Sequence, residues 1–256
     1  MNRFVSVTDL RKKLLSGQAS VGTWMQIPNA SVAEILGSMN FDWVTVDLEH
    51  GAFSIERLPD IFRAIELGNT LPFARLSSGN AVECKRVLDA GAAGVIVPMI
   101  SSAEQMESVI SSCQWPPTGT RGVGFSRANL FGRRFEDFKK EASAPFIVAM
   151  IESKEGLEHL DEIVTCKGLD AILLGPYDLS ASLGVLGEFD AYEFTEALSR
   201  VKEVCEGKNI PVGIHVVEAS VPQLQNRISE GYKFVAYSID TVMLLTSANI
   251  PLGEFL

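Results

Sequence analysis

Short apolar segments recur along this chain, and longer segments in which apolar residues follow a helical period separate them. The short segments are almost continuously apolar, as expected of parallel strands that are buried on both faces. This alternation predicts repeated βα units around a parallel sheet. Eight strands are predicted, at residues 21–27, 43–47, 72–76, 94–99, 146–152, 171–174, 211–216 and 234–239.

The segments between the strands predict helices, at residues 54–67, 81–90, 103–111, 191–206 and 221–230. Four of these helices are followed by a glycine, which is expected to end the helix in the left-handed conformation. The four glycines are Gly68, Gly91, Gly207 and Gly231. Residues 1–18 predict a further, amphipathic helix around Leu10 and Leu14, without the unbroken apolar stretch of a signal peptide.

Eight parallel strands close a barrel, whereas a doubly wound open sheet would show the same alternation. An open dinucleotide-binding sheet requires a GxGxxG motif after its first strand, but Ile27, Pro28 and Asn29 follow that strand here. We therefore expect an α/β fold, a single (β/α)₈ TIM barrel with an N-terminal helix and a long loop after the fourth strand. The 256 residues suit one domain over residues 1–256, with a core at about residues 20–245.

The charge and composition of the chain make some kinds of binding partner improbable. The formal net charge of -10 and the pI near 4.9 disfavour binding to nucleic acid or to an anionic membrane. No apolar stretch of the sequence is long enough to cross a membrane. The four cysteines lie far apart without CxxC spacing, which favours small apolar core residues in a reducing, cytoplasmic setting.

One stretch, residues 112–144, breaks the regular alternation. It contains the glycine-rich segment 119–124, which lacks the GK[ST] sequence of a phosphate-binding loop, and a basic, aromatic segment from Arg127 to Lys140. A long excursion near a barrel strand is more often functional than structural. We expect segment 119–124 to fold over the mouth of the barrel.

Polar residues directly follow the apolar strands, and in a parallel barrel these strand ends all open on the catalytic face. Glu152 and Asp178 end two successive strands, where two carboxylates would repel each other unless a cation bridges them. Two oxygen ligands suit Mg²⁺ or Mn²⁺, which keep positions for water and substrate. Each carboxylate could instead cap a following helix, a role that Asp178 fits.

His50 lies in the sequence Asp47-Leu48-Glu49-His50-Gly51, where a neighbouring carboxylate can raise its basicity toward that of a general base. The other two histidines, His159 and His215, are interpreted as structural. Asp89, at the end of the helix after the third strand, is a candidate carboxylate partner of His50, although a plain helix-terminal role is more common.

Arg75 ends an otherwise apolar strand, so its side chain must leave the sheet at the barrel mouth. A surface salt bridge is one explanation, and stabilisation of an enolate or carboxylate oxygen beside a metal is another. A Schiff-base aldolase needs a lysine on an inner strand, and the lysines here lie in helices, loops or strand starts. Metal-assisted enolisation is therefore the favoured carbon chemistry.

Several distinct motifs occur together and in order. They are Gly22-Thr23-Trp24, Asp47-Leu48-Glu49-His50-Gly51, the segment from Pro116 to Gly124, Ile151-Glu152 and Gly175-Pro176-Tyr177-Asp178. With them, the chain resembles the HpcH/HpaI family of metal-dependent pyruvate aldolases from about Gly22 to Asp240. The resemblance implies a (β/α)₈ barrel that cleaves 4-hydroxy-2-oxo acids to pyruvate and an aldehyde. It also implies a homo-oligomer, a hexamer or trimer, in which neighbours exchange the last helix.

The resemblance implies roles for individual residues. Glu152 and Asp178 would bind the divalent metal ion, with Mg²⁺ or Mn²⁺ expected first and Co²⁺ or Zn²⁺ as alternatives. His50 would be the base and Asp89 its partner. Arg75 would stabilise the enolate.

Substrate contacts are implied for Trp24, Arg75, Met150, Gly175, Pro176, Tyr177 and Asp178. Two of these residues depart from the family pattern: Met150 stands where members often carry a glutamine, and Tyr177 replaces a small residue. Three functions stay open at this point. The first is an aldolase acting on a small-molecule 2-oxo acid and an aldehyde, the second a synthase that joins an oxaloacetate-derived enolate to another acceptor, and the third a non-catalytic, acid-binding barrel.

Overall fold

The computed structural model of the chain describes residues 2–249 and contains the predicted closed barrel. Neighbouring strands are parallel all the way round, because the first strand pairs with both the second and the eighth. Closure excludes the open-sheet alternative. The strands are β1 (Ser20–Met25), β2 (Trp43–Asp47), β3 (Leu71–Arg75), β4 (Gly94–Val97), β5 (Phe146–Ile151), β6 (Ala171–Leu174), β7 (Val212–Val216) and β8 (Phe234–Ile239).

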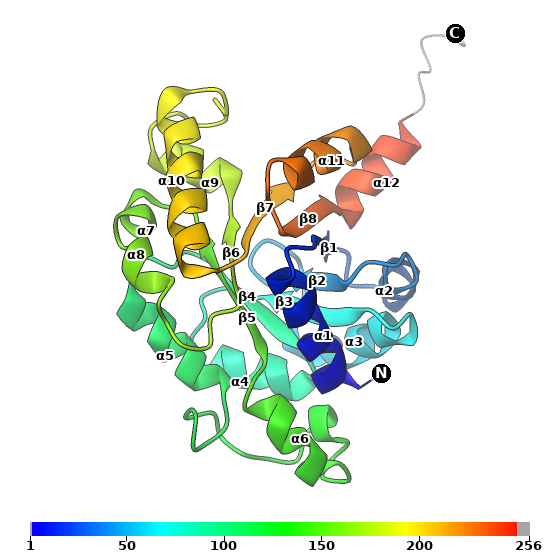
Figure 1. The fold of residues 1–256 in the computed structure, drawn as a ribbon. Helices are drawn as coiled ribbons and strands as arrows, with labels where there is room; N and C mark the ends of the chain where they lie inside the picture. Colours follow the sequence, from blue (N-terminus) through cyan, green and yellow to red (C-terminus); the bar gives the residue numbers. More distant parts are fainter. Residues whose placement is uncertain (1, 250–256) are drawn as a thin grey trace, which may run out of the picture.

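Helices surround the barrel, and α10 and α11 lie on either side of β7 (Figure 1). The α-helices are α1 (Arg3–Leu15), α2 (Ala30–Gly37), α3 (Leu58–Leu67), α4 (Ala81–Ala90), α5 (Ala103–Cys113), α6 (Phe135–Ala142), α7 (Lys154–Glu158), α8 (Leu160–Ile163), α9 (Pro176–Ser182), α10 (Tyr192–Lys208), α11 (Val221–Ser229) and α12 (Asp240–Ala248). Two 3₁₀ helices, η1 (Ile55–Arg57) and η2 (Arg127–Asn129), complete the set within residues 2–249. Met1 and residues 250–256 of the predicted domain lie outside the described residues.

Two of the four predicted glycine helix ends are confirmed. Gly91 and Gly231 have φ angles of 109° and 100°. Gly68 caps α3 as predicted, but its φ of -86° is not left-handed, and the prediction is wrong for Gly207, which lies inside α10. That helix continues to Lys208, and Asn209 takes the left-handed conformation instead, with φ 57°, because asparagine tolerates it better than other residues with a side chain.

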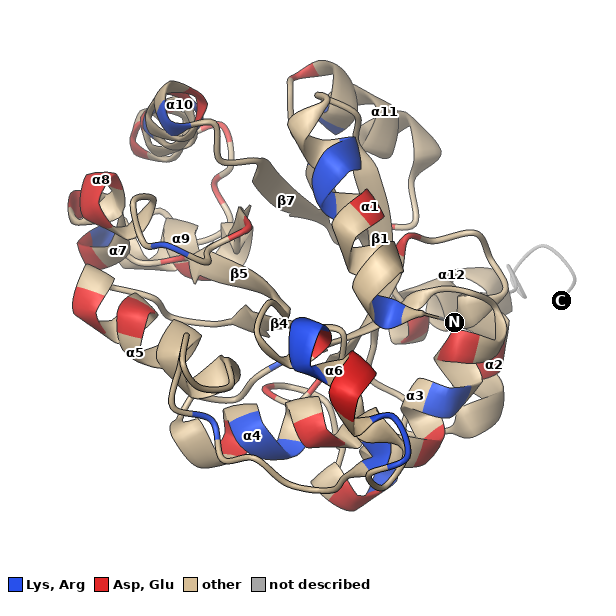
Figure 2. Cartoon of the chain, turned by 60° about the horizontal axis from the view of Figure 1, so that its bottom comes forward, with Lys and Arg blue, Asp and Glu red and all other residues tan. Residues whose placement is uncertain are grey.

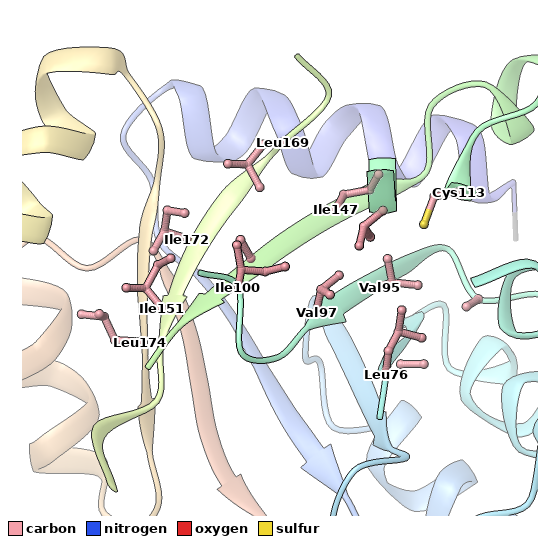
Figure 3. Close-up of a cluster of buried hydrophobic side chains, with 14 of the residues drawn as sticks. Leu76, Val95, Val97, Ile100, Cys113, Ile147, Ile151, Leu169, Ile172 and Leu174 are labelled. Carbon is pink, nitrogen blue, oxygen red and sulfur yellow. The ribbon is translucent and has the colours of Figure 1, made fainter. Parts of the chain in front are cut away.

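The barrel wall separates two apolar layers. Inside it, aromatic side chains stack near the starts of the strands: Trp43, Phe73, Phe146 and Phe234. Leu10 and Leu14 of α1 join this inner cluster, so the predicted N-terminal helix covers the amino-terminal end of the barrel. Outside it, side chains of β4, β5 and β6 pack toward the helices, as Val95 and Ile147 do in Figure 3. The four cysteines are free and buried, as predicted.

The excursion at residues 112–144 is not wholly irregular, because it contains η2 and α6. It follows α5, whose end lies at the amino-terminal end of the barrel. Arg121 anchors segment 119–124 there: its backbone N–H donates to Gln114 O at 2.9 Å, and its guanidinium donates to Cys113 O at 2.9 Å. The prediction that this segment folds over the mouth of its own barrel is therefore wrong.

Charged positions of both signs are interleaved on α4 and α6, whereas α5 and α8 carry acidic positions (Figure 2). Arg3 links α1 to this region, since its guanidinium lies 2.8 Å from Glu66 of α3, pairs with Glu141 of α6 and donates to Ala128 O. Within residues 2–249 no helix is both long and apolar enough to span a membrane.

Candidate active site

Asp47 and Arg75 end neighbouring strands and face each other in register. The Arg75 guanidinium donates from Nε and Nη2 to the two Asp47 oxygens, at 2.9 and 2.7 Å. Its Nη1 lies 2.9 Å from Glu49 Oε2. Both Asp47 and Arg75 are buried, which excludes the surface salt bridge that the sequence left open. Such a bidentate contact holds the guanidinium in one orientation.

Asp47 was not among the predicted site residues, although it begins the motif that contains His50. Besides Arg75, it accepts hydrogen bonds from Gln26 Nε2 at 2.9 Å and from the backbone N–H groups of Glu49 and His50, at 3.1 and 3.2 Å. Burial alone would raise the pKa of Asp47, but the hydrogen bonds and positive charge of Arg75 lower it below its usual value. Asp47 is therefore an ionised anchor for this part of the site.

Trp24 lies beside Arg75, with 4.4 Å between its ring centroid and the guanidinium carbon. Its other neighbour is His215, whose ring stacks on the indole at 5.3 Å. His215 Nε2 lies 3.2 Å from Ser238 O. The interpretation of His215 as only structural is incomplete, because the structure places this imidazole in the inner wall of the barrel mouth. Successive side chains of a strand point to opposite faces, so His215, next to the outward-facing Ile214 on β7, could have been predicted from the sequence to point into the barrel.

Glu152 follows β5 and is 2% exposed. Its Oε1 accepts a hydrogen bond from Met99 N at 2.6 Å. Burial raises the pKa of Glu152 to about 7, and the negative charges of Glu49 and Asp178 contribute to this shift, while the Met99 hydrogen bond and the charge of Arg75 oppose it. The carboxylates of Glu49 and Asp178 thus act on Glu152 in one region of the mouth.

Gly175 leaves the space next to Glu152 free. A Cβ atom at this position would lie 2.5 Å from Glu152 Oε2 and 3.3 Å from Met150 Cε. Met150, predicted to contact substrate, is 3% exposed and packs under the turn. The absence of a side chain at Gly175 therefore gives Glu152 room to use its second oxygen.

The turn after β6 carries the remaining predicted residues. Pro176 is the first residue of α9, Tyr177 is 52% exposed, and Asp178 is exposed in the first turn. Gly175, and not Asp178, is the N-cap residue, and no side chain caps this helix. The capping explanation for Asp178 is therefore not supported, and its carboxylate is available at the mouth.

The residues present fit a hard divalent cation. Within the described part of the chain, no group of three His, Cys, Asp and Glu side chains is arranged to hold a metal ion. Glu152 and Asp178 would supply two oxygen ligands and leave the other positions to water and substrate, as Mg²⁺ prefers. Burial first, and then the charges of Glu49 and Asp178, raise the pKa of Glu152 and so disfavour its ionised form, and a bound cation would offset both effects.

The structure does not bring His50 and Asp89 together within one chain. His50 is exposed after β2, and its backbone N–H donates to Asp47. Asp89 is half-buried at the end of α4, which lies at the opposite end of the barrel. No hydrogen bond partner of Asp89 Oδ1 lies among residues 2–249. Burial raises the pKa of Asp89, while the charges of Arg121 and Lys85 oppose this shift.

Known proteins are similar to this chain in sequence and in fold. The pattern of the HpcH/HpaI aldolase/citrate lyase family matches residues 20–247. The chain is 33% identical over 240 residues, 93% of each protein, to a hydroxypyruvate/pyruvate aldolase from Roseobacter denitrificans. The structure resembles an HpcH/HpaI aldolase/citrate lyase family protein from Burkholderia cenocepacia, with a TM-score of 0.89, 28% identity, and 96% and 98% of the two chains covered.

A second solved structure is a synthase. The citrate synthase SbnG superposes with a TM-score of 0.81 at 25% identity, and 96% of each chain is covered. The family match includes all the strands of the barrel and the residues at its mouth. This chain belongs to the HpcH/HpaI aldolase/citrate lyase family and is a carbon–carbon lyase.

Proposed function

We propose that the protein is a divalent-metal-dependent aldolase that reversibly cleaves a 4-hydroxy-2-oxo acid to pyruvate and an aldehyde. The observation that carries this proposal is the Arg75 guanidinium, which Asp47 fixes at the same barrel mouth as the buried Glu152 carboxylate. Aldol cleavage passes through an enolate, and a fixed positive group stabilises the negative charge that develops on its oxygen. The match to an aldolase at 33% identity supports the same assignment.

Glu152 and Asp178 are the residues that would hold the metal ion, for which we propose Mg²⁺ or Mn²⁺. When bound, such an ion polarises a keto group and makes the adjacent methyl group more acidic. The Met99 N–H holds one Glu152 oxygen in place, and the missing side chain at Gly175 leaves room at the other. The backbone of Gly175 to Asp178 would orient the carboxylate of pyruvate.

Two side chains of the protein would carry out the remaining steps, which are stabilisation of the enolate and transfer of the proton. Arg75, supported by Trp24, would donate hydrogen bonds to the enolate oxygen. His50, exposed at the mouth, would take the methyl proton and return it. Asp89 has no part in this proposal, because its carboxylate contacts none of these residues within one chain. Assembly as a homo-oligomer and a cytoplasmic location stay predictions.

A second candidate function is the synthase reaction, which the similarity to citrate synthase SbnG favours. Decarboxylation of oxaloacetate would supply the enolate, which would then attack a different acceptor. The same Arg75 and metal-binding residues would serve, because the enolate is common to both reactions. The two functions therefore differ in the source of the enolate and in the acceptor.

Exchange of the pyruvate methyl protons with D₂O, followed by NMR, tests the proposal. With Mg²⁺ or Mn²⁺ and no aldehyde, the protein should exchange these protons, and EDTA should stop the exchange. A non-catalytic, acid-binding barrel would give no exchange. Release of CO₂ from oxaloacetate, without exchange of pyruvate, would favour the synthase instead.

A further inference from the structure

A cavity of about 260 Å³ opens beside the candidate active site and is lined in part by residues of β7. The strand β7 runs between α10 and α11 (Figures 1 and 2). The lining of the cavity includes Tyr177, Phe189, His215, Glu218, Gln223 and Arg227. Tyr177 directly precedes Asp178, so the cavity borders the turn that would hold the metal ion. A larger cavity of about 380 Å³, lined by Leu14 and Lys233 among others, contains none of the candidate site residues.

His215 connects this cavity to the enolate side of the mouth. The imidazole stacks on Trp24, and the same indole contacts the Arg75 guanidinium. His215 is half-buried, whereas Trp24 is 2% exposed. A molecule that extends from Arg75 toward the cavity would therefore meet the His215 ring.

The hydrogen bond to Ser238 fixes the chemistry of this imidazole. A carbonyl oxygen can only accept, so His215 Nε2 carries the proton and Nδ1 is left as an acceptor. No described side chain or backbone group donates to Nδ1. Burial lowers the pKa of His215 to about 4, and the positive charge of Arg75 contributes to the shift, so the ring is neutral near pH 7.

Two further polar groups of the cavity, Gln223 and Arg227, already have partners. Gln223 Nε2 donates to Glu218 Oε2 at 2.8 Å, and Arg227 Nη1 lies 2.9 Å from Glu230 Oε2. The charge of Arg227 is thus offset by Glu230, and the negative charge of Glu218 disfavours a carboxylate or phosphate here. The rings of Tyr177 and Phe189 pack edge to face, with 5.2 Å between their centroids, and form an apolar wall of the cavity. Together these groups suit an uncharged ligand that has hydroxyl donors.

We propose that this cavity is the aldehyde subsite and that His215 is a specificity-determining residue, whose Nδ1 accepts a hydrogen bond from a hydroxyl group of a hydroxylated aldehyde. The proposal rests on the aldolase function proposed above and names the class of its second substrate. A site built to bind a hydroxyl group discriminates against the analogue that lacks it, because the acceptor is then left without its partner.

The test compares two aldehydes that differ by one hydroxyl group, glycolaldehyde and acetaldehyde, in condensation with pyruvate. His215→Phe keeps a ring on Trp24 but removes the acceptor, so we expect kcat/KM for glycolaldehyde to fall about tenfold relative to acetaldehyde. His215→Asn keeps an acceptor and should retain most of the preference. His159→Asn is the matched control, because His159 bonds Ser101 O outside the cavity, and its ratio should equal that of the wild type.

If His215→Phe still exchanges the pyruvate protons and its ratio of kcat/KM for glycolaldehyde to kcat/KM for acetaldehyde is unchanged, the subsite proposal is overturned. The proposed aldolase function is not affected by that result. Equal loss for both aldehydes would also overturn it, because His215 would then act on the fold or the enolate. If His215→Phe does not fold, His215→Leu takes its place with the same expected ratio. If the wild-type protein does not exchange the pyruvate methyl protons with D₂O, the proposed aldolase function is overturned, and the subsite proposal that rests on it is overturned as well.

Discussion

Asp47 and Arg75 form a bidentate ion pair across two adjacent strands, with N–O distances of 2.9 and 2.7 Å, and the Asp47 side chain is only 1% exposed. Glu49, the other partner of Arg75, is 20% exposed, and burial raises its pKa against the opposing charge of Arg75. Asp47 is therefore the fixed support of the guanidinium. Glu49 is the partner that a substrate oxygen would more easily replace.

The difference between these two carboxylates is testable. Asp47→Asn should slow pyruvate proton exchange by about tenfold or more, because it removes the charge that orients Arg75. It should also lower the thermal unfolding temperature, since a buried guanidinium loses its ionised partner. Glu49→Gln is the matched control and should slow exchange less. A larger effect of Glu49→Gln would mean that Glu49 is the main support of Arg75.

Gly175→Ala should weaken Mg²⁺ binding with little loss of folding stability. The added Cβ atom would lie 2.5 Å from Glu152 Oε2, so one of these groups must move. Gly207→Ala makes the same substitution inside α10, where a Cβ meets nothing within 4 Å, and should stabilise the protein by about 1 kcal/mol. Calorimetric titration with Mg²⁺ measures the first effect and thermal unfolding the second. Equal Mg²⁺ affinity in both variants would contradict the prediction.

Mg²⁺ binding should depend on pH through Glu152. This carboxylate must lose its proton to bind a cation, and its pKa is raised to about 7. At pH 6 most molecules carry the proton, so binding should release close to one proton, and at pH 8 almost none. Affinity should therefore rise with pH up to about 7 and then level off.

Calorimetry in two buffers of different ionisation enthalpy counts the released protons. Glu152→Gln provides the control, because it keeps the shape of the side chain but cannot ionise. We expect this variant to lose both the binding and the proton release. Proton release at pH 6 that persists in Glu152→Gln would assign the titration to another group.

His50→Ala should slow pyruvate proton exchange by about a hundredfold, because a positioned base typically contributes that much or more. His159→Ala is a matched substitution at an imidazole that lies 2.8 Å from Ser101 O and contacts none of the proposed site residues. Its exchange rate should stay near that of the wild type. Exchange at the wild-type rate in His50→Ala would remove this residue from the mechanism.

The sequence by itself determined the eight strands and the identity of most polar groups at their ends. Strand formation and burial depend on local composition, so the apolar segments that end before Glu152 and at Arg75 could be recognised directly. Because parallel strands in a barrel present their carboxyl ends on one face, the meeting of these groups at one mouth followed from the strand count.

Only the tertiary structure decided which groups contact each other. The pairing of Asp47 with Arg75 depends on the register of β2 and β3, and the stacking of His215 on Trp24 depends on the closure of the barrel. Asp89 lies at the opposite end from His50 because α4 runs antiparallel to the strands. Such contacts join residues far apart in the chain, and local sequence patterns carry no information about their distance.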